Sequence, residues 1–378
     1  MTLRVVIAPD SFKGSFDASA AAEAIGSGWR ARRPEDELIL LPQADGGEGT
    51  LDAIATAVPG SLLRDAGPVT GPDGRPTEGH WLELPDGTAV VELAQMAGLP
   101  LMDALDPMGA TTRGLGEVIA AALDAGASAL VIGLGGSAST DGGAGALRAL
   151  GLELLDADGA PVPDGGGGLA RVVSIDASRL RTPPPGGVRL LSDVTAPLLG
   201  STGAAAVFGP QKGASPEQVA QLDAALARYA ALLQFALGVD GGASPWAGAE
   251  GAGAAGGTGY GLLAAWGAGI EAGSAAIARL TGFAAAAASA DVVITGEGRF
   301  DATSSTGKVV GNALALADVG DARAAVIAGM LDADPVTPAG RRVWSASLSD
   351  LAGSPDAAMD DPGRWLFAAG VEAARALG

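Results

Sequence analysis

The stretch Leu3-Arg4-Val5-Val6-Ile7-Ala8-Pro9-Asp10 begins with a β-branched run and stops at a proline and an acid. A short apolar run that ends at such a breaker predicts a buried β-strand. An alanine-rich helix is predicted next, at residues 18–31, then a strand at 38–41 and a helix at 50–57. This β-α-β-α order is typical of a parallel sheet covered by helices.

The pattern changes after Pro59. Residues 61–93 form short alternating segments, separated by the turn signals Gly71-Pro72-Asp73-Gly74 and Pro85-Asp86-Gly87. Alternation with such turns predicts antiparallel hairpins, and therefore a second sheet.

The last part of the chain returns to β-α-β order, with strands predicted at 291–295, 324–328 and 342–346. We expect these strands to complete the N-terminal sheet. The predicted fold class is α/β: a discontinuous, parallel-sheet, Rossmann-like domain (1–65 and 285–378) and an inserted mixed-sheet α/β domain (66–284). A length of 378 residues agrees with two domains.

Composition excludes several classes of function. The net charge of −20 argues against nucleic acid or an anionic membrane as partner. The absence of cysteine excludes thiol catalysis and thiolate metal sites, and a single histidine excludes a histidine cluster. No apolar run reaches the roughly 18 residues of a membrane span. We expect a soluble cytoplasmic protein, either a monomer or a homodimer, that acts on small molecules.

The basic residues are unevenly distributed. Twenty are arginine, and the three lysines, Lys13, Lys212 and Lys308, each adjoin a glycine. Arginine is a planar fork whereas lysine is a compact point charge, so a site that requires lysine does not accept the exchange. Chance survival of the three lysines is the alternative.

Acidic side chains follow five of the predicted strands. A single acid there is usually a turn former or a helix N-cap. Five together indicate a ligand site, because ligands of open α/β sheets bind beyond the carboxyl ends of the strands. Carboxylates without cysteine or histidine clusters suit Mg²⁺. The residues are Asp10, Asp45 with Glu48, Asp141, Asp193, and Glu297 with Asp301.

A glycine-rich loop, Gly133-Leu134-Gly135-Gly136-Ser137-Ala138-Ser139-Thr140-Asp141-Gly142-Gly143, follows a predicted strand and precedes a short helix. It matches neither the dinucleotide fingerprint nor a Walker A loop. Exposed N–H groups at such a position favour an anion, although a tight turn is the alternative. Carboxylates, glycine loops and lysines together predict phosphoryl transfer from a nucleotide.

Four strings carry a family resemblance: residues 8–15 (APDSFKGS), 44–50 (ADGGEGT), 209–214 (GPQKGA) and 251–257 (GAGAAGG). Together they resemble the type 1 glycerate kinase family, over the whole length of the chain. Lys13 and Lys212 lie inside these strings, and Lys308 ends a further family-like string, residues 295–308.

Three other family-like strings, residues 135–143, 193–198 and 295–308, depart from the family pattern. Ser139 and Thr140 stand where the family usually has Thr and Asn, Ala196 replaces Asn, and Thr303 replaces Gln. These changes remove side-chain amides, which puts the fine substrate contacts in doubt. The charged residues of the strings remain.

The resemblance implies an ATP- and Mg²⁺-dependent kinase that phosphorylates D-glycerate, with a preference for the 2-hydroxyl. It also implies two α/β domains with the active site in the cleft between them. A kinase for another small hydroxy acid or polyol is one alternative. A non-catalytic ligand-binding relative is the other.

Roles are assigned as hypotheses. Asp193 is the first candidate for base or metal ligand, Asp45 is the second for base, and Glu297 is a further metal ligand. Lys13 or Arg299 pairs with the glycerate carboxylate, while Lys212 and Lys308 neutralise the transferred phosphoryl, unless one lysine only ties the domains together. The expected substrate contacts are Asp10, Ser11, Lys13, Gly46, Gly47, Glu48, Arg299 and Asp301. The expected nucleotide contacts are Gly135, Gly136, Ser137, Asp141, Lys212, Gly256 and Gly257.

Overall fold

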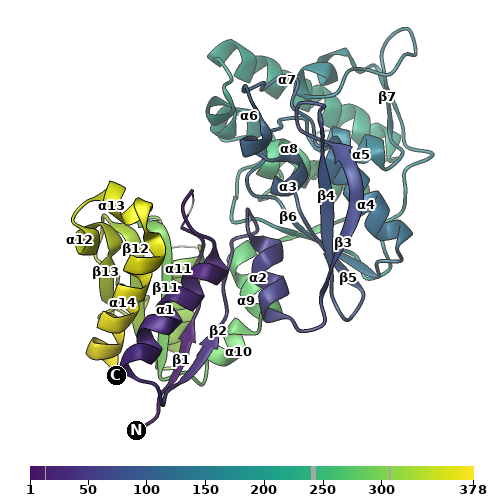
Figure 1. The fold of residues 1–378 in the computed structure, drawn as a ribbon. Helices are drawn as coiled ribbons and strands as arrows, with labels where there is room; N and C mark the ends of the chain where they lie inside the picture. The colour runs from purple at the N-terminus through teal and green to yellow at the C-terminus, as the bar shows by residue number, and fades with distance from the viewer. Residues whose placement is uncertain (13, 240–243, 306–307) are drawn as a thin grey trace. The chain divides into compact units, whose positions relative to one another are not determined.

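A computed structural model describes residues 1–12, 14–239, 244–305 and 308–378 of the chain, which divides into two compact units (Figure 1). The first unit comprises Met1–Asp45, Gly49–Pro59 and Ala272–Gly378. The second comprises Gly46–Glu48 and Gly60–Glu271. The predicted α/β class, with one discontinuous parallel-sheet part and one inserted mixed-sheet part, is confirmed.

The first unit is built on a five-stranded sheet in which every neighbouring pair is parallel. C-terminal strands continue the N-terminal sheet, as expected. The sheet order is β13 (Trp344–Ser347), β12 (Arg323–Leu331), β11 (Val292–Phe300), β1 (Arg4–Ile7) and β2 (Glu37–Leu40).

Helices cover both faces of this sheet, which explains the continuous apolar run in β1. Val5 and Ile7 belong to a core with α1 (Ala18–Arg32) and α14 (Pro362–Leu377). Val6 belongs to the opposite core, with α10 (Phe283–Ala287) and α11 (Val309–Val319). The remaining helices of the unit are α2 (Thr50–Ala57), α9 (Gly273–Leu280), α12 (Leu348–Ala352) and α13 (Pro355–Asp360).

Helices α1 and α14 lie side by side on one face (Figure 1) and approach at glycines. A Cβ at Gly28 would lie 2.0 Å from the Phe367 carbonyl oxygen, and one at Gly370 would lie 2.3 Å from the Ile25 oxygen. No real Cβ sits that close to a backbone oxygen, so any larger residue would push the helices apart.

We therefore expect Gly370→Ala to lower the free energy of unfolding by about 1–3 kcal/mol, the usual cost of overpacking. Gly363→Ala on the same helix is the control, because its Cβ would meet only the Phe16 ring, at 3.3 Å. Urea unfolding of both variants measures the difference. Equal stabilities would show that the helices separate freely.

The second unit is built on a six-stranded mixed sheet. Its order is β10 (Gly269–Glu271), β9 (Val188–Leu191), β6 (Ala129–Gly133), β5 (Thr88–Glu92), β4 (Pro76–Glu83) and β3 (Leu62–Thr70). The first four are mutually parallel, whereas β4 pairs antiparallel with both β3 and β5. The hairpins predicted within residues 61–93 are confirmed.

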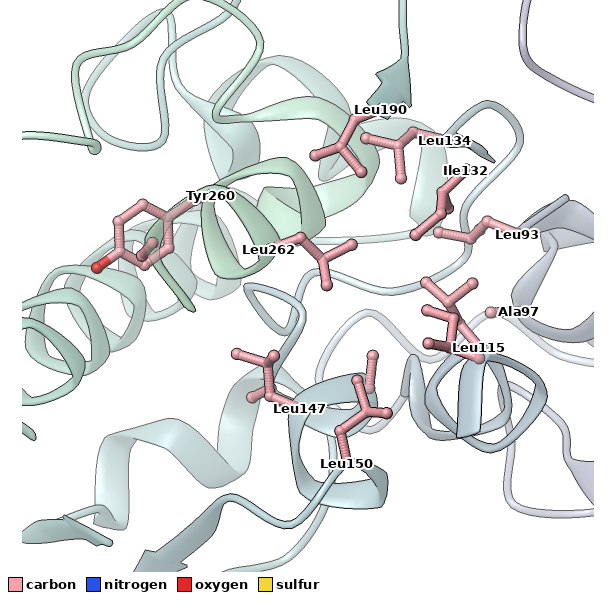
Figure 2. Packing of buried hydrophobic residues seen from close by; sticks show 14 of the residues in the cluster. Leu93, Ala97, Leu115, Ile132, Leu134, Leu147, Leu150, Leu190, Tyr260 and Leu262 are labelled. Atoms are coloured by element: carbon pink, nitrogen blue, oxygen red, sulfur yellow. The ribbon is translucent and has the colours of Figure 1, made fainter. Parts of the chain in front are cut away.

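A single large core fills this unit and anchors the ends of its central strands. In Figure 2 the side chains of Ile132, Leu134 and Leu190 lie next to one another, with Leu93 beside them. Leu134 is the second residue of the glycine-rich loop, so packing holds the start of that loop.

The helices of the second unit are α3 (Ala94–Ala97), α4 (Arg113–Asp124), α5 (Ala144–Ala149), α6 (Ala204–Phe208), α7 (Pro216–Ala236) and α8 (Ala254–Trp266). A further ribbon pairs β7 (Glu153–Leu155) with β8 (Ser174–Asp176), and short 3₁₀ helices span Leu99–Leu101, Gly166–Arg171 and Pro210–Lys212.

The strand predicted at 291–295 is longer than expected. β11 continues through Phe300 beside β12, so Glu297 lies within the strand instead of beyond its end. Glycines permit this extension, because a Cβ at Gly296 would lie 2.1 Å from the Ile327 oxygen. A glycine just past the predicted end of the strand therefore allows two strands to approach closely.

Candidate functional site

In the first unit, several predicted residues gather at the carboxyl edge of the parallel sheet. The Asp10 N–H donates to the Gly296 oxygen (2.8 Å), which ties the end of β1 to β11. The Ser11 N–H donates to Asp10 Oδ1 (2.7 Å). The Gln43 N–H donates to the Pro9 oxygen (2.9 Å), so the segment that leads to Asp45 follows the same edge. Lys13 lies outside the described residues, and its role stays a prediction.

A second group in this unit follows β11. Arg299 Nε lies 2.5 Å from Asp332 Oδ2, so the guanidinium expected to bind glycerate already has an ion pair. Asp301 Oδ1 accepts hydrogen bonds from the Thr303 N–H (2.7 Å) and hydroxyl (2.6 Å). The exposed Lys308 donates to that hydroxyl (3.3 Å). These contacts with Thr303, and then the charge of Lys308, lower the pKa of Asp301.

In the second unit, Gly46 lies against the carboxyl ends of two parallel strands. A Cβ at Gly46 would lie 2.9 Å from the Leu191 oxygen, and one at Gly133 would lie 2.5 Å from the Gly46 oxygen. The Gly135 N–H donates to that same oxygen (3.0 Å). The exposed Asp193 lies two residues beyond the end of β9. The glycine string 46–47, the glycine loop and Asp193 therefore share one sheet edge.

The glycine loop itself offers hydrogen-bond donors. Gly136 is exposed with φ of 76°, and the Ser137 hydroxyl lies 3.1 Å from the Ser139 hydroxyl. Across the described residues, the backbone N–H groups of Gly136 and Ser137 have no protein acceptor. Adjacent N–H groups of this kind form a concavity suited to an anion.

Asp141 fixes the far end of this loop. Its buried Oδ2 accepts from the Thr112 N–H and hydroxyl, each at 2.9 Å, and from the Gly145 N–H at 3.2 Å. Oδ1 accepts from the Gly143 N–H at 3.1 Å. Burial raises the pKa of Asp141, against the lowering effect of these bonds. Asp141 thus joins the loop to α4 and α5, and a direct contact with nucleotide is not what this geometry provides.

Two other family-like strings meet the loop at Ser139. Lys212, 2% exposed, donates from Nζ to the Ser139 carbonyl oxygen. A Cβ at Gly256 would lie 2.0 Å from the same oxygen, and the Gly142 N–H donates to the Gly256 oxygen (3.0 Å). Gly256 and Gly257 both have positive φ, 64° and 91°. Residues 70 to 120 positions apart in sequence are therefore in contact here.

Two residues at this site were not selected from the sequence. Thr112, in an unremarkable polar triplet, holds Asp141. Glu92 ends β5 and is 2% exposed, beside Gly133 in the register. An acid at the end of an apolar run was the available signal for Glu92. Thr112 had none, because its partner is 29 residues away.

Comparisons with known proteins show which family the chain belongs to. The profile of the Glycerate kinase family matches residues 5–378. The chain belongs to the glycerate kinase family. Glycerate kinase of Bacillus subtilis (strain 168) is 44% identical over 81% of this chain and 79% of its own length. Glycerate 2-kinase of Escherichia coli (strain K12) is 44% identical over 81% and 80%.

A solved structure is also similar. The crystal structure of a protein from Salmonella typhimurium LT2, named as glycerate kinase 2, is 37% identical and superposes with a TM-score of 0.83. The match covers 100% of this chain and 98% of that one. The predicted family and its phosphotransferase class are confirmed. Within the described ranges, no helix combines the length and apolar character that a membrane span requires.

Thr112 and Thr140 make a matched pair for a stability test, because both hydroxyls are buried and only one is hydrogen-bonded within the described residues. The Thr112 hydroxyl donates to Asp141 and accepts from the Ala146 N–H (3.0 Å), whereas the buried Thr140 hydroxyl has no hydrogen-bond partner in the described structure. Thr112→Val is expected to cost about 1.5–3 kcal/mol, because a buried charge loses a donor. Thr140→Val is expected to be neutral or stabilising. Chemical denaturation decides, and equal losses would contradict this assignment.

Lys212 predicts a pH dependence of stability. Burial lowers its pKa from 10.5 to about 8, although the Asp141 charge raises it. Between these values the unfolded chain binds a proton that the folded chain does not, so the free energy of unfolding rises with pH. Relative to Lys212→Met, the wild type should gain at most about 3 kcal/mol across that window. Denaturant titrations at several pH values test this, and parallel pH profiles would refute it.

Proposed function

We propose that this chain transfers the γ-phosphoryl group of ATP to D-glycerate, at the 2-hydroxyl, with Mg²⁺ as cofactor. The observation that carries the proposal is the convergence of three strings on one glycine loop, in which the N–H groups of the exposed Gly136 and of the largely buried Ser137 have no acceptor among the described residues. The name of the Escherichia coli relative, glycerate 2-kinase, supports both the acceptor and the position.

The proposed nucleotide site lies in the second unit. Backbone N–H groups at a strand-to-helix loop bind phosphate oxygens without adding side-chain charge. This matters in a chain of net charge −20, where positive side chains are scarce. The N–H groups of Gly136 and Ser137 would receive the phosphates, beside Gly135, whose own N–H is bonded to the Gly46 oxygen. Gly256 and Gly257 would keep side chains away from the side of the loop that faces them.

Asp193 is the proposed base, with Asp45 as the second choice. In the reaction, the glycerate hydroxyl oxygen bonds to the γ-phosphorus while the bond to the β–γ bridging oxygen breaks. ADP leaves, and the hydroxyl proton passes to the carboxylate. An exposed carboxylate such as Asp193 is accessible to the acceptor without any rearrangement of the core.

The residues present fit Mg²⁺ bound mainly through phosphate. No group of three or more acidic or histidine side chains in the described ranges is arranged to hold a metal alone. Mg²⁺ ordinarily uses one or two carboxylates, with waters and phosphates completing its octahedron. Asp193 and Glu297 would supply the carboxylates. The ion, when bound, neutralises charge on the phosphates.

One observation favours a second acceptor. Arg299 is paired with Asp332, and Thr303, which replaces the usual Gln, occupies one oxygen of Asp301. Two groups expected to bind glycerate, Arg299 and Asp301, thus already have partners within the protein. A related hydroxy acid or polyol that needs fewer charged contacts is the alternative substrate.

The decisive measurement is coupled ADP release by purified protein with Mg²⁺-ATP and D-glycerate, beside a panel of small hydroxy acids and polyols. We expect turnover with D-glycerate, and phosphorus NMR of the product to show phosphate on the 2-hydroxyl. Turnover only with another acceptor would replace the substrate. No turnover with any acceptor would favour a ligand-binding protein.

Asp193→Asn should lower kcat by at least about 100-fold, the usual contribution of a positioned base. Because Asp193 is exposed, the variant should unfold at the wild-type temperature. Asp158→Asn, also exposed and on a turn after β7, is the control. Wild-type kcat in the Asp193 variant would remove it from this role.

A further inference from the structure

The backbone of Lys212 is fixed before its side chain is considered. It ends a 3₁₀ turn, Pro210–Lys212, in which its N–H donates to the Gly209 oxygen (3.0 Å). Gly213 follows with φ of 90°, and Ser215 then caps α7 through a reciprocal bond with Gln218. The origin of the side chain is therefore held by two regular elements.

The Lys212 side chain points into the protein. It is 2% exposed, and Nζ donates to the Ser139 carbonyl oxygen. A side chain with so little exposed surface has almost no area against which a phosphate oxygen could lie. This differs from the expectation that Lys212 neutralises the transferred phosphoryl directly.

The loop residue that Lys212 holds is also held from other sides. Asp141, two positions on, is bonded to both the N–H and the hydroxyl of Thr112. Gly256 packs its backbone against the Ser139 oxygen and accepts from the Gly142 N–H. Ser139–Gly142 is thus clamped between a cation, a carboxylate and a glycine backbone.

We propose that Lys212 is a positioning residue, which holds the Ser139 carbonyl so that the loop 135–141 presents its Gly136 and Ser137 N–H groups to phosphate. The inference rests on the proposed function only in naming phosphate as what those groups receive. The two halves can therefore be tested separately.

The chemistry explains why this position carries lysine. The buried Ser139 oxygen accepts from Lys212 Nζ and, at 3.5 Å, from the Ser137 hydroxyl, and the loss of a donor at a buried carbonyl is costly. An ammonium on a flexible stem reaches it through a narrow space, whereas a planar guanidinium needs more room. The charge of Asp141 favours the ammonium form.

The first measurement is hydrogen–deuterium exchange of the full-length protein without nucleotide. In Lys212→Met, which keeps the stem and loses the donor, peptides covering 133–145 should exchange at least about tenfold faster, as loss of one charged hydrogen bond implies. Lys212→Gln retains an N–H donor on a shorter stem and should restore part of the protection. Lys308→Met, in the first unit, is the control and should leave these peptides unchanged.

The second measurement is the Kd of Mg²⁺-ATP by calorimetry for wild type, Lys212→Met, Thr112→Val and the double variant. If both residues act through one loop, each should weaken binding and the double variant should lose less than the product of the two fold-changes. The KM for the acceptor should be unchanged within about twofold, whereas general unfolding would shift both substrates.

The outcomes separate the alternatives. Unchanged loop exchange in Lys212→Met together with weakened ATP binding would overturn the proposal, because the lysine would then contact phosphate directly. Fully multiplicative effects in the double variant would overturn it as well. If Lys212→Met does not fold, Lys212→Gln is read in its place, and wild-type loop exchange together with weakened ATP binding in that variant would overturn the proposal in the same way. Faster exchange in a protein whose wild type binds no Mg²⁺-ATP would support the clamp and refute the proposed function alone.

Discussion

The second unit depends on the close contact between the backbone at Ser139–Gly142 and the left-handed turn at Gly256. A Cβ at Gly256 would lie 2.0 Å from the Ser139 oxygen, and one at Gly261 would lie 2.4 Å from the Gly142 oxygen. Two backbones this close leave no room for side chains or for much water between them. Their polar groups must then be satisfied by the protein, which is what Lys212 and Asp141 do. Much of the high glycine content serves such contacts, because a residue with a Cβ would clash there.

Burial acts against both charges at this contact. It raises the pKa of Asp141, against the hydrogen bonds from Thr112, Gly143 and Gly145, and it lowers the pKa of Lys212, against the charge of Asp141. A clamp of this kind costs free energy in the folded state, yet it gives the loop one shape. That suits a protein with a net charge of −20, since correctly oriented N–H groups attract an anion without further cations.

Much of the fold was predictable because local pattern and tertiary environment agree. The apolar run of β1 is buried on both faces, and α2 spans 50–57 as the sequence predicts. Predictions were weaker where glycine has two meanings. The strand predicted at 291–295 stops before Gly296, but Gly296 lets β11 continue and pass close to β12. A tight turn and a close approach of two backbones both require glycine. Only the position of the adjacent strand shows which of the two a given glycine serves.

The sequence by itself determined the family and which residues are candidates for the functional site: the acids after strands, the glycine loop and the three lysines. It did so because strand ends, turn glycines and lysine chemistry are local properties. Only the tertiary structure decided what the residues touch. Lys212 meets Ser139, 73 positions away, Arg299 meets Asp332, and Thr112 meets Asp141. Such pairs are set by how strands and loops pack in three dimensions. A single sequence carries no direct record of which distant residues lie close together in space.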